Sequence, residues 1–205
     1  MKTIIFDMDG TLIDSGDIIA DTINYVRSHF DLHPLEKLDL LCNVNNPEIH
    51  PPLYFYEVET YSQKHIELFE SFYHQNFMDK IRLYDGIFEL LSEFSNHFRY
   101  AIATNAHTLV AKNMVKHLKI DHHFEKIVGV DDVKNAKPHP DMICKILQDL
   151  NLEKKDVFLI GDSKKDALAA SNAGIDSLLV NWGFSEHDEA ISDISELKNI
   201  LRKRK

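Results

Sequence analysis

The chain has 205 residues, with 23 Lys and Arg against 33 Asp and Glu, which gives a formal net charge of −10 at pH 7. This acidic balance argues against a polyanion such as DNA as a general partner, although a compact phosphate ester beside a bound cation is compatible with it. Cys42 and Cys144 lack CxxC spacing, and no apolar run approaches the length of a membrane span. We therefore expect a cytoplasmic protein without a nucleic-acid or membrane partner.

Apolar runs that predict strands alternate along the chain with stretches that predict helices. The predicted strands are residues 3–6, 99–103, 126–130, 157–160 and 177–180. Helical spacing predicts buried helix faces formed by Ile87, Leu90, Leu91 and Phe94, by Leu109, Val110, Met114 and Leu118, and by Met142, Ile143, Ile146, Leu147 and Leu150. Such alternation is typical of parallel βαβ units, so we predict an α/β fold with a Rossmann-like parallel sheet as its core.

Residues 15–80 interrupt this alternation and are too many for a loop in a compact domain. Apolar residues follow helical spacing near both ends of the stretch, which predicts an α-helical insertion. Its middle, from Asn43 to Pro52, is rich in turn residues and predicts an irregular loop between helices. The aromatic run of residues 54–56 fits either the core of the insertion or a surface for substrate or a second copy. We thus predict a core of residues 1–14 and 81–205 and a helical insert of residues 15–80.

Asp7 and Asp9 follow the first predicted strand directly. Residues i and i+2 of an extended strand point the same way, and open α/β sheets bind their ligands at the carboxyl ends of their strands. Gly10 lets the chain turn away, and Thr11 offers a hydroxyl and an N–H close to both acids. The pair predicts an active site, with an ordinary charged turn as the alternative.

Three further segments accompany the other predicted strands: Thr104-Asn105, Ala136-Lys137-Pro138, and Gly161-Asp162 with Asp166 four residues later. Taken alone, they also fit a buried strand end, a solvated lysine and a helix N-cap. Together with the Asp-x-Asp-Gly-Thr segment, in this order, the chain resembles the haloacid dehalogenase superfamily, in particular its phosphatases similar to phosphoglycolate phosphatase. The resemblance covers residues 1–15 and 83–184, and it implies a central first strand and an insert that forms a cap domain.

The resemblance implies a Mg²⁺-dependent phosphatase that hydrolyses a small phosphorylated metabolite through an aspartyl-phosphate intermediate. Asp7 would be the nucleophile, and Asp9 would protonate the leaving group and then activate water. Asp7, the main-chain carbonyl of Asp9 and Asp162 would hold Mg²⁺, and Asp166 would act through water or by orienting its neighbours.

The resemblance also implies how the phosphate is bound. Thr104 would donate its hydroxyl to a phosphate oxygen, with the N–H of Asn105 beside it at a helix start. Pro138 excludes Lys137 from helical backbone angles, and the ammonium of Lys137 would lie against both the nucleophile and the phosphate.

Other functions stay open from the sequence. A phosphomutase or phosphonatase on the same scaffold would need further groups in the cap, such as a lysine for a Schiff base, for which Lys37 and Lys64 are candidates. A binding module without catalysis is a third reading, and the converging acids argue against it because their repulsion costs stability. The predicted cap loop carries Asn and Pro where the phosphoglycolate phosphatase pattern usually has Gly, which leaves the substrate open. The choice between monomer and homodimer is open as well.

Overall fold

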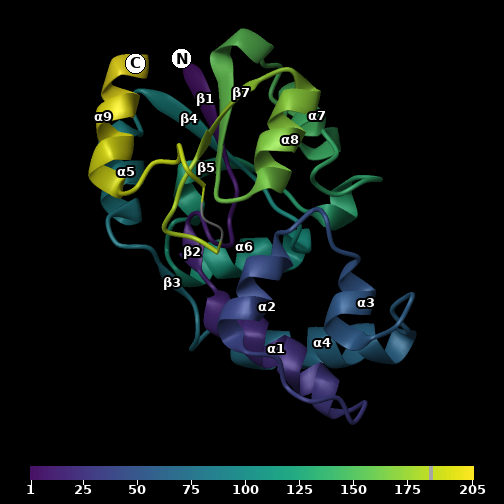
Figure 1. The fold of residues 1–205 in the computed structure, drawn as a ribbon. Helices are drawn as coiled ribbons and strands as arrows, with labels where there is room; N and C mark the ends of the chain where they lie inside the picture. Colours follow the sequence, from purple (N-terminus) through teal and green to yellow (C-terminus); the bar gives the residue numbers. More distant parts are fainter. Residues whose placement is uncertain (185–186) are drawn as a thin grey trace.

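The computed structural model describes residues 1–184 and 187–205. Its core is a five-stranded parallel sheet in the order β5-β4-β1-β6-β7 (Figure 1). The strands are β1 (Lys2–Phe6), β4 (Phe98–Ala103), β5 (Phe124–Val128), β6 (Val157–Gly161) and β7 (Asp176–Leu179). Phe6 at the end of β1 lies opposite Ile102 in β4 and Ile160 in β6, so these three strands end level with one another. The predicted fold class and the central position of the first strand are confirmed.

Helices cover both faces of the sheet because strand side chains alternate between the faces. Ile4 and Phe6 pack with α5 (Ile87–Phe94), α6 (Thr108–His117) and α9 (Ile194–Arg204), whereas Ile5 packs with α7 (Asp141–Asp149) and α8 (Lys164–Ala173). In Figure 1, α5 and α9 lie on one side of the sheet and α7 and α8 on the other. Strands buried on both faces explain the continuous apolar runs of the sequence.

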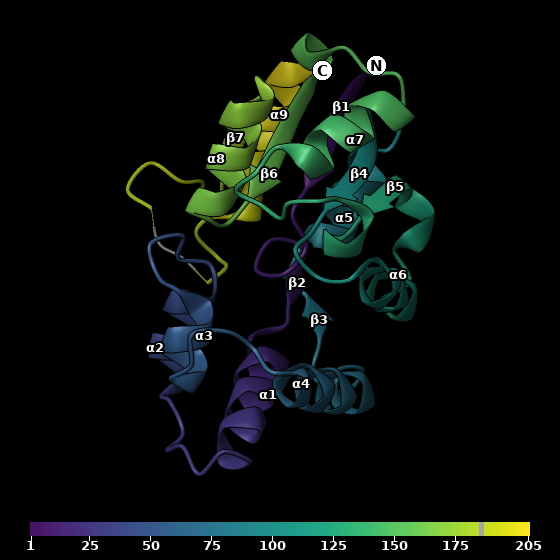
Figure 2. The ribbon, with the colours of Figure 1, turned by 90° about the vertical axis from the view of Figure 1, so that its right-hand side faces the viewer.

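Four helices lie beyond the carboxyl ends of the strands, far from both termini (Figures 1 and 2). They are α1 (Gly16–Ser28), α2 (Lys37–Val44), α3 (Pro51–Tyr56) and α4 (Gln63–Asn76), and we call them the cap helices. They share an apolar cluster formed by Ala20, Ile23, Val26, Leu40, Phe55 and Tyr56. The antiparallel pair β2 (Ile13–Asp14) and β3 (Arg82–Leu83) joins the chain where it enters and leaves this region. A domain boundary at residues 14 and 80 remains a prediction.

Two details of the sequence prediction are wrong. The loop expected from Asn43 to Pro52 is shorter, because α2 continues through Val44 and α3 begins at Pro51, where proline needs no N–H partner. Leu109 was expected in the buried face of its helix but is 65% exposed. Met114 is buried as predicted, and residues 108, 111 and 115 are buried beside it. Strand ends also differ from the predicted ones by one or two residues.

Short 3₁₀ turns, Asp121–His123, Val130–Asp132 and Lys154–Asp156, complete the regular structure. Within the described part of the chain, no helix has both the length and the apolar character that crossing a membrane requires.

Candidate active site

The carboxylates of Asp7 and Asp9 follow the end of β1, on the edge of the sheet that faces the cap helices. The Asp7 N–H donates to the Ile160 carbonyl at 2.8 Å, which ties this residue to β6, and its side chain is buried. The Thr11 hydroxyl lies 3.5 Å from Asp7 Oδ2, and the Ser15 hydroxyl donates to Asp9 Oδ1 at 2.6 Å. The two acids therefore have different partners, and burial raises the pKa of Asp9 although the Ser15 hydroxyl opposes this.

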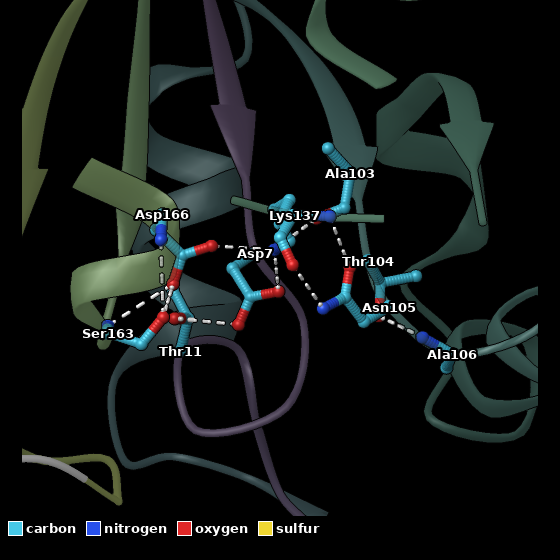
Figure 3. Close-up of polar contacts among 9 residues, drawn as sticks. All are labelled: Asp7, Thr11, Ala103, Thr104, Asn105, Ala106, Lys137, Ser163 and Asp166. Atoms are coloured by element: carbon cyan, nitrogen blue, oxygen red, sulfur yellow. Dashed lines mark hydrogen bonds and ion pairs between the residues drawn. The ribbon is translucent and has the colours of Figure 1, made fainter. Parts of the chain in front are cut away.

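Lys137 lies between Asp7, which follows β1, and Asp166, which belongs to the first turn of α8 (Figure 3). Its Nζ donates to Asp7 Oδ1 at 2.5 Å, to Asp166 Oδ1 at 2.6 Å and to the Ala103 carbonyl at 2.7 Å. These contacts use all three ammonium protons. Burial alone would lower the pKa of Lys137, but the charges of Asp166 and Asp7 outweigh burial and raise it, so this side chain is a fixed cation.

Asn105 holds the main chain of Lys137 with its side-chain amide. Its Oδ1 accepts from the Lys137 N–H at 3.0 Å, and its Nδ2 donates to the Lys137 carbonyl at 3.1 Å (Figure 3). The neighbouring Thr104 is buried at the end of β4, and its Oγ1 accepts from the Ala106 N–H at 3.1 Å. Because that oxygen acts as an acceptor, its proton remains available for a bound anion. The sequence prediction missed the clamp made by the Asn105 side chain.

Asp162 and Asp166 come from the end of β6 and the first turn of α8. Asp162 is fully buried, and its Oδ2 accepts from the Phe184 N–H at 2.8 Å, whereas Oδ1 has no hydrogen-bond partner among the described residues. Asp166 Oδ2 accepts from the N–H and the hydroxyl of Ser163, at 3.2 and 2.5 Å. Asp166 is therefore fixed by the helix cap on one oxygen and by Lys137 on the other.

The backbone leaves little room around Asp162. Gly10 has a φ of +87°, and a Cβ at this position would lie 2.3 Å from Asp162 Oδ2. A Cβ at Gly183 would lie 2.2 Å from the Gly10 carbonyl oxygen. Both positions therefore require glycine, and together they hold the turn after β1 against the acid that follows β6.

Asp7, Asp162 and Asp166 can each offer one carboxylate oxygen to a common point, because these atoms lie within 4.8 Å of one another. Burial first, and then the neighbouring acids, raise the pKa of Asp7 well above its usual range and that of Asp162 to about 7. A cation would relieve this repulsion, and the unpartnered Oδ1 of Asp162 offers it a ligand. An all-oxygen donor set suits a hard divalent ion such as Mg²⁺.

The sequence analysis did not predict two hydrogen bonds that side chains of the core make to distant main-chain carbonyls. The Lys165 Nζ, at the start of α8, donates to the Val44 carbonyl at the end of α2, 3.0 Å away. The Trp182 Nε1 donates to the Thr11 carbonyl at 3.0 Å, which places the segment after β7 against the first acidic turn. The first contact links the core to the cap helices, and the second supports the turn that carries Asp9.

Comparison with known families agrees with this arrangement. Residues 4–180 match the family model described as haloacid dehalogenase-like hydrolase. The chain belongs to this family. This match confirms the family that the four motifs predicted. It also confirms the predictions of a hydrolase and of an α/β fold.

Relatives of the haloacid dehalogenase-like chain include the pyrophosphatase PpaX of Anoxybacillus flavithermus, 26% identical over 98% of this chain and 97% of that protein. PpaX of Bacillus mycoides is 26% identical over 89% of this chain and 84% of its own length. Among solved structures, a predicted phosphatase from Clostridium acetobutylicum superposes with a TM-score of 0.88 at 26% identity, with 98% of each chain covered. A haloacid dehalogenase-like hydrolase from Streptococcus pneumoniae has a TM-score of 0.76 at 28% identity, with 97% of this chain and 90% of that chain covered.

Proposed function

We propose that this hydrolase is a Mg²⁺-dependent phosphatase that cleaves a small phosphorylated metabolite through an aspartyl-phosphate on Asp7. The observation that carries the proposal is the Asp7 carboxylate, fixed by Lys137 on one oxygen and surrounded by further buried acids. The names of the relatives, pyrophosphatase and predicted phosphatase, support phosphate transfer to water as the reaction.

In the first step, an Asp7 oxygen attacks phosphorus, and the bond between phosphorus and the ester oxygen breaks. Lys137 holds Asp7 Oδ1, so the attacking group keeps one orientation before substrate arrives. The free hydroxyl proton of Thr104 can bind a phosphate oxygen. Because Lys137 already uses its three protons, we assign it to orientation and charge compensation, and its direct contact with phosphate remains a prediction.

Asp9 supplies and then recovers the proton. Burial raises its pKa, which favours the protonated acid that the leaving alkoxide needs. Asp9 gives this proton to the leaving oxygen, and the resulting carboxylate takes a proton from the water that attacks the phosphorylated Asp7. Free phosphate leaves, Asp7 regains its carboxylate, and the Ser15 hydroxyl keeps Asp9 in place throughout.

Asp7, Asp162 and the main-chain carbonyl of Asp9 would hold Mg²⁺, and the ion, when bound, offsets the negative charge that the carboxylate and phosphate bring together. Asp166 makes its contacts to Lys137 and Ser163, which fits a residue that orients its neighbours. Its predicted place among the metal ligands remains a proposal.

A phosphomutase or phosphonatase is less well supported. Lys37 forms an exposed ion pair with Asp17, and Lys64 lies 5.3 Å from the centre of the Phe30 ring. Neither side chain is among the described residues that line the cavity above Asp7. The cap thus offers the substrate no lysine of the kind that a Schiff base needs.

Substitutions of the two acids test the mechanism. Asp7→Asn keeps the shape but removes the nucleophile, so Mg²⁺-dependent release of phosphate should fall below detection while the thermal unfolding curve remains cooperative. Asp9→Asn should slow phosphorylation by an alkyl phosphate more than by an aryl phosphate, whose leaving group needs no proton. Substantial turnover by Asp7→Asn would refute the nucleophile, and equal losses for the two esters in single-turnover measurements would refute the acid.

A further inference from the structure

A cavity of about 680 Å³ lies between the cap helices and the carboxyl edge of the sheet. Asp7, Asp9 and Lys137 line it at the sheet, and α1, α3 and α4 line it on the cap side. A phosphate group with one or two carbon atoms would fill only a small part of this space, which has the size of sites for drug-sized ligands. The remainder surrounds the leaving group of the substrate.

The cap side of this cavity is apolar and aromatic. Its lining includes Ile19, Ile23, Phe55, Tyr56, Phe69 and Tyr73. At the cavity edge, Tyr61, Ile66 and Leu109 are 42%, 41% and 65% exposed, so large apolar groups from both the cap and the core remain uncovered by protein. A flat apolar ligand would cover them, and aromatic side chains favour a ring as the contacting group.

The cavity offers almost no cation to a second anionic group. Of the described residues that line it, the Lys and Arg side chains are Lys137 and Lys165 alone, and both belong to the core. Lys137 is neutralised by Asp7 and Asp166, and Lys165 donates to a carbonyl of the cap. The carboxylate that the cap contributes, Glu70, would repel a further negative charge.

One polar group of the cap side lacks a partner. His65 lines the cavity and is 5% exposed, with its ring stacked on Phe30 at 4.0 Å between centres. Its Nδ1 accepts from the Ser62 N–H at 3.2 Å, which places the proton of the neutral ring on Nε2. Nε2 has no hydrogen-bond partner among the residues that the structure describes. Because the Nε2 atom is itself closed to solvent, a ligand in the cavity does not reach it, and His65 sets no requirement for an acceptor on the substrate.

We infer that the substrate is a phosphomonoester whose leaving alcohol carries a flat, uncharged aromatic or heteroaromatic ring. This inference rests on the proposed phosphatase function and differs from the small anionic compounds in the names of the similar proteins. Pyrophosphate would bring a second phosphate, and phosphoglycolate a carboxylate, to a cap side whose described lining residues include no Lys or Arg. The ring would lie against the aromatic side chains of α3 and α4.

The esters in the test all release primary alcohols, so that their leaving groups differ little in chemical reactivity, and the anhydride pyrophosphate is assayed beside them. Benzyl phosphate should exceed ethyl phosphate in kcat/KM by at least about 10-fold, because the ring gains apolar contacts. The 4-carboxybenzyl ester, phosphoglycolate and pyrophosphate should each fall at least about 10-fold below benzyl phosphate.

Two variants of one helix provide a matched comparison. Phe69 and Phe72 both lie in α4, but Phe69 lines the cavity whereas Phe72 stacks on Tyr25 outside it. Phe69→Leu should reduce the ratio of kcat/KM for benzyl over ethyl phosphate about fivefold, and Phe72→Leu should leave that ratio unchanged. Thermal unfolding of both variants verifies that the cap helices remain folded.

The outcomes separate this inference from the proposed function. If no ester is hydrolysed with Mg²⁺, the phosphatase itself is refuted. If esters are hydrolysed but pyrophosphate or phosphoglycolate is preferred, or Phe69→Leu leaves the benzyl ratio unchanged, the aromatic leaving group is refuted.

Discussion

Asp162→Asn should stabilise the metal-free protein, although it removes a proposed metal ligand. Burial and the charge of Asp166 raise the pKa of Asp162 from 3.8 to about 7, so the folded state binds this proton more tightly than the unfolded state does. The stability linked to the protonated acid is therefore complete below pH 4 and is lost as the pH rises through 7. Relative to low pH, stability is lower by on the order of 4 kcal/mol at pH 8, where the folded acid is ionised, and by about 2 kcal/mol at pH 5, where the folded acid is protonated but the unfolded acid is ionised. Asparagine avoids this cost and keeps an oxygen for the Phe184 N–H.

Thermal unfolding in the presence of a chelator measures the effect. For a chain of this length, Asp162→Asn should raise Tm by about 4–8 °C at pH 5 and by about 8–16 °C at pH 8. Asp176→Asn, at an exposed position in β7, should show no such pH dependence. Adding Mg²⁺ should raise the Tm of the wild type at pH 8 and leave that of Asp162→Asn almost unchanged. A variant that is less stable than the wild type at pH 8 without metal would refute the reasoning.

Two further substitutions test how the backbone supports the site. Asn105→Ala removes both hydrogen bonds to the Lys137 main chain, so we expect kcat to fall at least about 10-fold with little change in KM. Asn105→Asp keeps the acceptor and should recover part of this loss. A wild-type kcat in both variants would contradict the role of the Asn105 side chain in holding Lys137. Gly10→Ala forces a Cβ onto Asp162 and should abolish stabilisation by Mg²⁺, whereas Gly174→Ala has a similar φ of +75° and no contact closer than 3.4 Å, and should cost only about 1–2 kcal/mol of stability. Equal behaviour of the two glycine variants in Mg²⁺ titrations followed by Tm would show that crowding of Asp162 is unimportant.

The core could be predicted from the sequence because its signals are local. Asp7, Thr104 and Asp162 each follow an apolar strand directly, and parallel strands bring their carboxyl ends to one edge of the sheet. The structure brings these three residues together with Lys137 in the way that the order of the motifs suggested. The chemical roles assigned to them await the experiments above.

Other features of the site could not be predicted, because they depend on contacts with main-chain atoms, which every residue type provides. Lys165 donates to a main-chain carbonyl, and any residue at position 44 would provide the same acceptor. The side chain of Asn105 likewise contacts backbone atoms far along the chain. Leu109 follows helical spacing yet turns toward the cavity, because spacing defines a stripe on a helix and not the direction in which the helix is rotated. The helix α2 ends, and α3 begins, inside the segment from Asn43 to Pro52, whose composition is dominated by turn residues.

The central position of β1 also has a consequence for synthesis on the ribosome. Thr3 pairs with Arg99 in β4 and with Val157 in β6, so this early strand acquires its second neighbour only after most of the chain has been translated. Until then, at least one of its edges can pair with other extended chains, as unpaired strands do. The cap helices emerge in the meantime, and their contacts are close in sequence, which favours rapid formation. A nascent chain should therefore present folded cap helices beside an apolar strand that depends on chaperones until β6 has left the ribosome.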